Sequence, residues 1–195
     1  MSPRQSAHPI DAVFLERWSP RAFDAAPMPE ADLYTLFEAA RWAPSAFNSQ
    51  PWRFLYARRD DEDWPLFLSL LIPWNQSWAH SASALIYILS DTTPFTGKDG
   101  GPAPSHTHSF DAGAAWACLA LQATRLGYLA HGMSGIELDR ARAALRVPER
   151  FRIEAAVAVG RLGDPAALSE KLRAWEVPSA RVPIEERVFH GRFPA

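Results

Sequence analysis

Residues 110–128 are the most restrictive stretch of the chain, because the helix that they predict is apolar on almost every side. Alanine is its commonest residue, while Asp111 near the start and Gly127 near the end are typical of helix boundaries. A helix with so little polar surface must be buried on most of its sides. One domain of 195 residues offers limited space for that, so part of this helix is expected to face another subunit.

Periodicity predicts the other elements. Strands are expected over 52–58, 84–89 and 151–160, where apolar residues alternate or run together. Helices are expected over 10–16, from Pro29 to about residue 41, and over 65–72, 137–145 and 168–175. This order predicts an α+β fold with a mainly antiparallel sheet between helices. With 48% hydrophobic residues the chain suffices for one core, so residues 1–195 are treated as a single domain.

A polar linker joins the second of these helices to the first strand. Pro44 and Pro51 disfavour helical geometry at the residues before them, so the linker is extended or turned. Its hydrogen-bonding side chains are all uncharged: Ser45, Asn48, Ser49 and Gln50. Such donors and acceptors on a loop suit a flat heterocycle with both kinds of group at its edge. An ordinary polar loop is the alternative.

A basic segment lies further upstream. Pro20 forces Ser19 into an extended conformation, so Arg17, Ser19 and Arg21 project to one side. Two guanidinium groups beside a hydroxyl make a phosphate clamp, because arginine is suited to bidentate contact with oxyanions. A solvated basic edge is the alternative.

Together, Arg17-Trp18-Ser19-Pro20-Arg21-Ala22-Phe23 and Pro44-Ser45-Ala46-Phe47-Asn48-Ser49-Gln50-Pro51-Trp52-Arg53-Phe54 resemble the nitroreductase family of flavin enzymes. The two motifs occur in the family's order, and the likeness runs over nearly the whole chain. The resemblance implies FMN as cofactor and NADH or NADPH as transient donor. It also implies an intertwined homodimer with the 110–128 helix at its core and the C-terminal tail exchanged onto the partner.

The resemblance further implies a set of cofactor-binding residues: Arg17, Trp18, Ser19, Arg21, Pro44, Ser45, Ala46, Asn48, Gln50, Asn75, Ser134, Gly135 and Arg181. Arg17, Ser19 and Arg181 would hold the phosphate, and Asn75 would contact the flavin ring. Arg21 would lie near the pyrimidine edge and tune the ring electrostatically. No side chain is assigned a catalytic role, because flavin performs the hydride transfer.

In the family, backbone N–H groups of a turn such as 132–136 approach flavin N5, and glycine permits that approach. An ordinary strand-to-helix turn is the alternative.

Trp78 and Ser179 stand where some relatives have lysine, and core packing is the expected role of Trp78. His106 and His108 could suggest a metal site, but no third ligand is near in sequence. A loop over 91–109 bordering the substrate pocket is the favoured interpretation.

Composition excludes other classes of protein. A net charge of −2 provides no basic field for nucleic acid, and no apolar run is long enough to span a membrane. Cys118 is the single cysteine, so an intrachain disulfide is excluded. We interpret this residue as a small core side chain. The N-terminus lacks the apolar centre of a secretory signal, so a cytoplasmic protein is expected.

The expected function is that of an FMN-dependent NAD(P)H oxidoreductase. It would reduce nitroaromatics, quinones or related small-molecule acceptors by a ping-pong mechanism. Two alternatives remain open. One is a specialised flavin enzyme of the same fold, such as a dehalogenase or dehydrogenase. The other is a flavin-binding storage or sensor protein without useful turnover.

Overall fold

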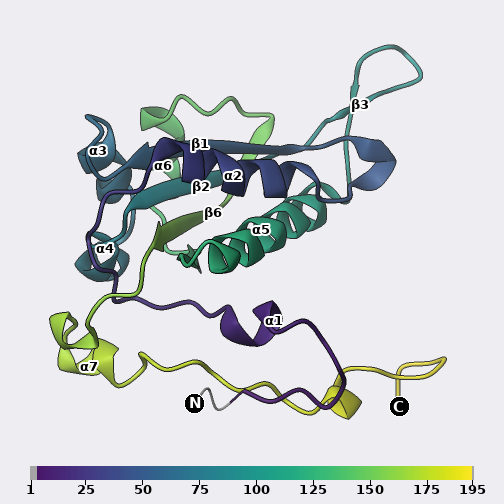
Figure 1. The fold of residues 1–195 in the computed structure, drawn as a ribbon. Helices are drawn as coiled ribbons and strands as arrows, with labels where there is room; N and C mark the ends of the chain where they lie inside the picture. The colour runs from purple at the N-terminus through teal and green to yellow at the C-terminus, as the bar shows by residue number, and fades with distance from the viewer. Residues whose placement is uncertain (1–3, 195) are drawn as a thin grey trace.

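A computed structural model describes residues 4–194 of the chain. Its centre is an antiparallel sheet of four strands in the order β1 (Trp52–Arg58), β2 (Ala84–Asp91), β6 (Phe151–Gly160) and β5 (Leu129–Met133), shown in Figure 1. All three strand pairs are antiparallel. The α+β class and the mainly antiparallel sheet predicted from the sequence are therefore confirmed.

The central strand β2 shows why the sheet lies between two layers of helices. Every residue of this strand is buried. Leu85 and Tyr87 point into one hydrophobic core, whereas Ile86 and Ile88 point into the other. Successive side chains of a strand face opposite sides, so an apolar strand of this kind requires cover on both faces.

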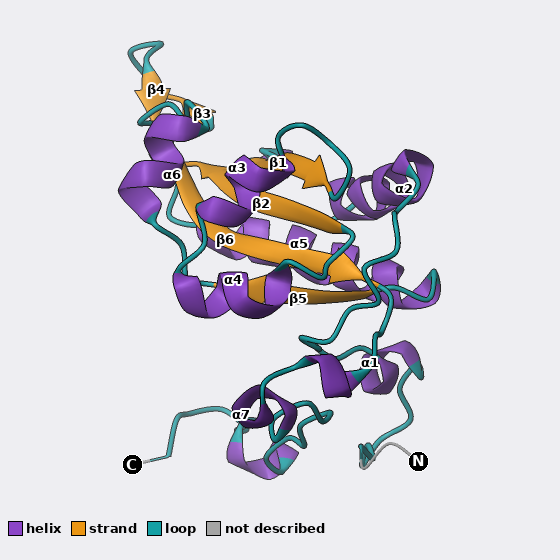
Figure 2. Ribbon diagram, turned by 90° about the vertical axis from the view of Figure 1, so that its left-hand side faces the viewer, coloured by secondary structure: helices purple, strands orange, loops and turns teal. Residues whose placement is uncertain are grey.

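Helices provide that cover, as Figure 2 shows. On one face lie α2 (Glu30–Arg41) and α5 (His108–Arg125), which contribute Leu33, Leu36 and Leu119 to their core. On the other face lie α3 (Trp64–Ser69), α4 (Pro73–Ala79) and α6 (Leu138–Ala144). None of the helices between residues 4 and 194 is both long enough and apolar enough to traverse a lipid bilayer.

Two thin segments lie outside these layers. The N-terminal segment with α1 (Val13–Glu16) runs beside the tail that follows α7 (Glu170–Arg173), as the purple and yellow traces of Figure 1 show. The tail contains one 3-10 turn, Ile184–Glu186, and every residue from 179 to 194 is exposed. A small hairpin of β3 (Phe95–Thr96) and β4 (Pro102–Ala103) projects from the body of the molecule.

Helix α5 is the longest helix of residues 4–194, as predicted, but it is not buried on most sides within one chain. Its inner face, with Ala115 and Leu119, packs on the sheet. Its outer face leaves Phe110 79% exposed, and Gly113 and Ala117 are also exposed. The apolar character that the sequence showed is therefore divided between a core face and an open face.

Strands 52–58 and 151–160 are confirmed with the predicted bounds. The predicted helix 65–72 is wrong at its end, because the chain leaves the helix after Ser69 and Leu71 then forms a bridge with Ile136. Helix α4 was not predicted. It begins at Pro73, whose fixed φ suits the first turn of a new helix.

Other elements also differ from the sequence-based expectation. Strand β5 was not predicted, because its five residues include Gly132 and lack an alternating pattern. The loop expected over 91–109 contains the β3–β4 hairpin and the start of α5. The helix expected over 168–175 is shorter, because only Glu170–Arg173 (α7) is helical there, and an unpredicted 3-10 turn, Pro165–Ala167, precedes it.

Candidate functional site

A cavity of about 330 Å³ lies between the segment after α1 and the chain that follows α7. Five of the expected cofactor-binding residues line it: Arg17, Trp18, Ser19, Arg21 and Arg181. Arg17, Ser19 and Arg21 thus face one cavity, and Trp18, which strict alternation would place on the opposite side, lines it as well. We call residues 17–21 the clamp segment and this space the clamp cavity.

The sheet holds the clamp segment in place. Phe23, which follows it, forms an antiparallel bridge with Leu162 just beyond β6. Gly163 donates its N–H to the Ala22 carbonyl at 2.9 Å. A side chain at Gly163 would meet the backbone of Phe23, because a Cβ there would lie 2.3 Å from the Phe23 carbonyl oxygen. Glycine is therefore required at this close approach.

Glu176 fixes the other side of the same segment. Its side chain is 8% exposed, and Oε1 accepts the backbone N–H groups of Arg21 at 2.7 Å and Ala22 at 2.8 Å. These two N–H groups lie outside the main sheet, so the carboxylate satisfies donors that would otherwise be orphaned. The guanidinium of Arg21 lies over the ring of Trp175, 5.9 Å from its centroid.

Positive charge is concentrated in the clamp cavity. Burial and the nearby charge of Arg181 lower the pKa of Arg17. Burial, followed by the charges of Arg181 and Arg17, lowers the pKa of Arg4, which also lines the cavity. Mutual repulsion of this kind is relieved by an anion placed between the guanidinium groups.

His131 of β5 forms part of the cavity wall and is neutral at pH 7. Burial is the main reason that its pKa falls to about 4, and the charge of Arg21 lowers it further. The Nδ1–H of the neutral ring donates to the Pro20 carbonyl at 2.8 Å. Trp78 packs against this ring at a centroid distance of 4.6 Å and is 1% exposed, which confirms the core role expected for it.

Asn75 of α4 and the turn after β5 form a second group. The Asn75 amide Nδ2 donates to the Gly135 carbonyl at 3.0 Å, while Ser134 is exposed. A Cβ at Gly135 would lie 2.5 Å from Asn75 Nδ2, so packing accounts for this glycine. The ring centroids of Trp74 and Trp175 lie 6.2 Å apart, which places α4 beside the wall of the clamp cavity.

The polar linker between α2 and β1 forms a third group, and none of its residues lines the clamp cavity. Pro44, Asn48 and Gln50 are exposed, whereas Ser45 and Ala46 are partly buried. In Figure 1 this linker lies at the end of the molecule that carries the β3–β4 hairpin, away from α7. One chain therefore does not bring the linker to the clamp cavity.

Strained backbone gives the linker its shape. Phe47, Asn48 and Gln50 have φ values of 52°, 55° and 47°, a region that bulky residues rarely adopt. The Gln50 N–H donates to Ser45 Oγ at 3.0 Å and closes the turn. Asp111, 3% exposed at the start of α5, accepts the Ala46 N–H at 3.2 Å. Strain maintained by such contacts is typical of functional loops.

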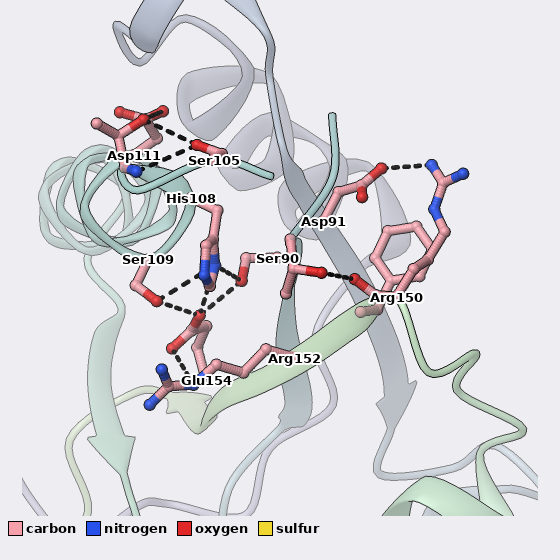
Figure 3. Close-up of polar contacts among 12 residues, drawn as sticks. Ser90, Asp91, Ser105, His108, Ser109, Asp111, Arg150, Arg152 and Glu154 are labelled. Carbon is pink, nitrogen blue, oxygen red and sulfur yellow. Dashed lines mark hydrogen bonds and ion pairs between the residues drawn. The ribbon is translucent and has the colours of Figure 1, made fainter. Parts of the chain in front are cut away.

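His108 belongs to a buried polar cluster rather than to an open loop (Figure 3). Its Nδ1 lies 2.8 Å from Ser90 Oγ, and Glu154 Oε1 accepts from Ser90 at 2.6 Å and Ser109 at 2.7 Å. Glu154 is the extra residue where β6 is bulged against β2, which turns its side chain toward α5. His106 is exposed, and residues 4–194 contain no group of three His, Cys, Asp or Glu placed to hold a metal.

Comparison with known proteins shows similarity to a solved structure, to two protein sequences and to a family model. The chain is 53% identical to the crystal structure of an oxidoreductase containing FMN, with a TM-score of 0.96, over 100% of this chain and 98% of that one. It is 37% identical to an uncharacterized 15.4 kDa protein of Mycolicibacterium smegmatis, over 72% of this chain and 97% of that protein.

The third similarity is local. The chain is 41% identical to a protein of Streptomyces coelicolor named as an NADH dehydrogenase/NAD(P)H nitroreductase, over 29% of this chain and 28% of that protein. A model of the nitroreductase family matches residues 15–64, the range that contains both motifs. With the fold, these similarities establish that the chain belongs to the nitroreductase family.

Proposed function

We propose that the protein is an FMN-dependent oxidoreductase that uses NADH or NADPH to reduce nitroaromatics, quinones or related small acceptors. The main support is the clamp cavity, where Arg17, Ser19 and Arg181 surround a space of about 330 Å³. Guanidinium and hydroxyl groups in one cavity suit a phosphate monoester, the group that distinguishes FMN from riboflavin. The similar oxidoreductase that contains FMN supports the same cofactor.

The polar linker suits the other end of this cofactor. Its Ser45, Asn48 and Gln50 side chains donate and accept without carrying charge, which matches the edge of a flavin ring. Bound FMN supplies the hydride chemistry, while the protein binds, orients and tunes it. We assign Arg21 to the negative charge that reduction places on the ring. A fixed cation there stabilises the reduced form more than the oxidised form, whereas a phosphate contact stabilises both equally.

The separation of linker and clamp supports a site shared by two copies of the chain. A homodimer would bring the linker of one copy to the clamp cavity of the other. The open face of α5, with Phe110, Gly113 and Ala117, offers an apolar surface for this contact. The exposed tail beyond Arg181 is the part that would pass to a partner, because none of residues 182–194 lines the clamp cavity. We therefore include tail exchange in the proposal.

An anaerobic titration tests the activity. Purified protein loaded with FMN is mixed with NADH or NADPH, and the flavin absorbance is followed before and after adding a quinone or a nitroaromatic. Bleaching by a nicotinamide and recovery with the acceptor support the proposed reaction. Tight FMN binding without bleaching by either donor would instead indicate a storage or sensor protein. Sedimentation of the FMN-loaded protein tests assembly, and a stable loaded monomer contradicts the shared site.

A further inference from the structure

Arg4 joins three parts of the chain that are distant in sequence. Its Nε donates to the Ser179 carbonyl of the tail at 2.9 Å. Its Nη1 donates to the Leu15 carbonyl at 3.3 Å and also to the Arg17 carbonyl. One planar guanidinium thus connects α1, the clamp segment and the C-terminal tail.

Polar contacts hold the part of the tail that lines the clamp cavity, because Ser179 and Arg181 are exposed. Val182 and Ile184 lie further along the tail, about half exposed, and line a second space together with Ile10 and Phe14. Arg181 donates from Nη1 to the carbonyls of Ser179 and Ala180, which are local contacts within the tail. The Ser179 carbonyl therefore accepts hydrogen bonds from both Arg4 and Arg181. Arg4 links this point of the tail to the rest of the chain.

Electrostatics opposes this arrangement when no anion is present. Arg4, Arg17 and Arg181 line one cavity, and the pKa values of Arg4 and Arg17 are lowered partly by the charge of Arg181. The repulsion weakens docking of the tail, since Arg181 lies on its exposed part. A dianion between the three groups reverses the sign of this interaction. Anion binding and docking of the tail must then favour each other, as linkage requires.

We propose that Arg4 is a positioning residue of the phosphate site: it clips the tail to the clamp segment so that Arg181 faces Arg17, and phosphate binding closes this clip. The inference rests on the proposed function, because FMN is the ligand whose phosphate would occupy the cavity. It adds a residue outside both sequence motifs and makes tail docking dependent on the anion.

Binding measurements on three Arg4 variants test the clip. Arg4→Ala removes charge and hydrogen bonds, and Arg4→Lys keeps the charge but cannot bridge three carbonyls. Arg4→Gln keeps donors without charge. We expect Arg4→Ala to weaken FMN binding by about tenfold to a hundredfold, the effect of one hydrogen bond to a charged group, and to leave riboflavin binding unchanged. Arg4→Lys and Arg4→Gln should fall between Arg4→Ala and the wild type.

Limited trypsin digestion gives a readout that does not depend on activity. FMN or inorganic phosphate should slow cleavage after Arg181 in the wild type, while riboflavin should not, and Arg4→Ala should lose this protection. Arg187→Ala is the matched control, because that exposed side chain donates to the neighbouring Glu186 carbonyl at 3.1 Å and does not line the clamp cavity. It should keep both the preference for FMN and the protection.

The outcomes separate the inference from the proposed function. Wild-type protein that binds FMN no better than riboflavin overturns the cofactor assignment and the clip together. Wild-type protein that prefers FMN, while Arg4→Ala and Arg4→Lys keep the same preference and protection, overturns the clip alone. Equal protection by riboflavin and by phosphate also overturns it, since the anion would then play no part in docking the tail.

Discussion

His131 makes the stability of the protein depend on pH in a way that can be calculated. The folded chain lowers the pKa of this residue from 6.5 to about 4, mainly by burial. In the unfolded chain the ring regains its ordinary pKa. Between these two values the unfolded state binds a proton that the folded state does not, so stability rises with pH there.

The size of the effect follows from the same two values. One pKa unit corresponds to about 1.4 kcal/mol, so the shift to about 4 corresponds to about 3 kcal/mol. Above pH 6.5 the ring is neutral in both states and its titration contributes nothing. As pH falls from 6.5 to 4 the protein loses this amount progressively, and below pH 4 this residue causes no further loss.

Urea unfolding of the apo protein between pH 4 and pH 7 measures the loss. Carboxylates also titrate in this range, so the informative quantity is the difference between the wild type and His131→Gln, whose amide can still donate to the Pro20 carbonyl. The variant should lose less stability on acidification, by about 3 kcal/mol. His80→Gln, at the exposed end of α4, should follow the wild type. Parallel curves of unfolding free energy against pH for the wild type and His131→Gln would refute the argument. An NMR titration of the folded protein with a His131 midpoint near pH 6.5 would also refute it.

Three further substitutions test how the two loops are held. Glu176→Ala orphans the N–H groups of Arg21 and Ala22 and should cost about 2–5 kcal/mol in urea unfolding, with Glu176→Gln costing less. An unchanged midpoint would contradict the assigned contacts. Gly163→Ala forces a Cβ against the Phe23 carbonyl, so it should destabilise by at least about 1–3 kcal/mol and weaken FMN binding. Phe47→Gly should match or exceed wild-type stability, because it relieves about 1 kcal/mol of backbone strain and removes a side chain that is 96% exposed. A large loss of stability would show that the ring is needed.

The clamp segment could be predicted from the sequence because its geometry is local. Pro20 fixes the extended backbone, and alternation then places Arg17, Ser19 and Arg21 on one side. Strand β6 was predicted for the same reason, since period-two alternation is visible within a few residues. Strand β5 was missed because its five residues include Gly132 and show no such alternation.

The residues that support the site could not be predicted, because their partners are distant in sequence. Arg4 contacts Ser179, and Glu176 contacts the backbone of the clamp segment. The acceptor in the first contact and the donor in the second are backbone groups, which carry no side-chain signal. His131 likewise gave no motif, and only its packing against Trp78 and Pro20 places it in the cavity wall.

The two loops of the proposed site share one structural device. Each lies outside the main sheet, so some of its N–H groups lack a strand partner, and a buried carboxylate accepts them instead. Glu176 holds the clamp segment, and Asp111 holds the polar linker at Ala46. A carboxylate that accepts two hydrogen bonds tolerates burial, and Asp111 also accepts from Thr107 Oγ1 at 3.0 Å. Because these two carboxylates accept from backbone N–H groups, neither of them pairs with the guanidinium groups of the clamp segment or with the amide side chains of the polar linker.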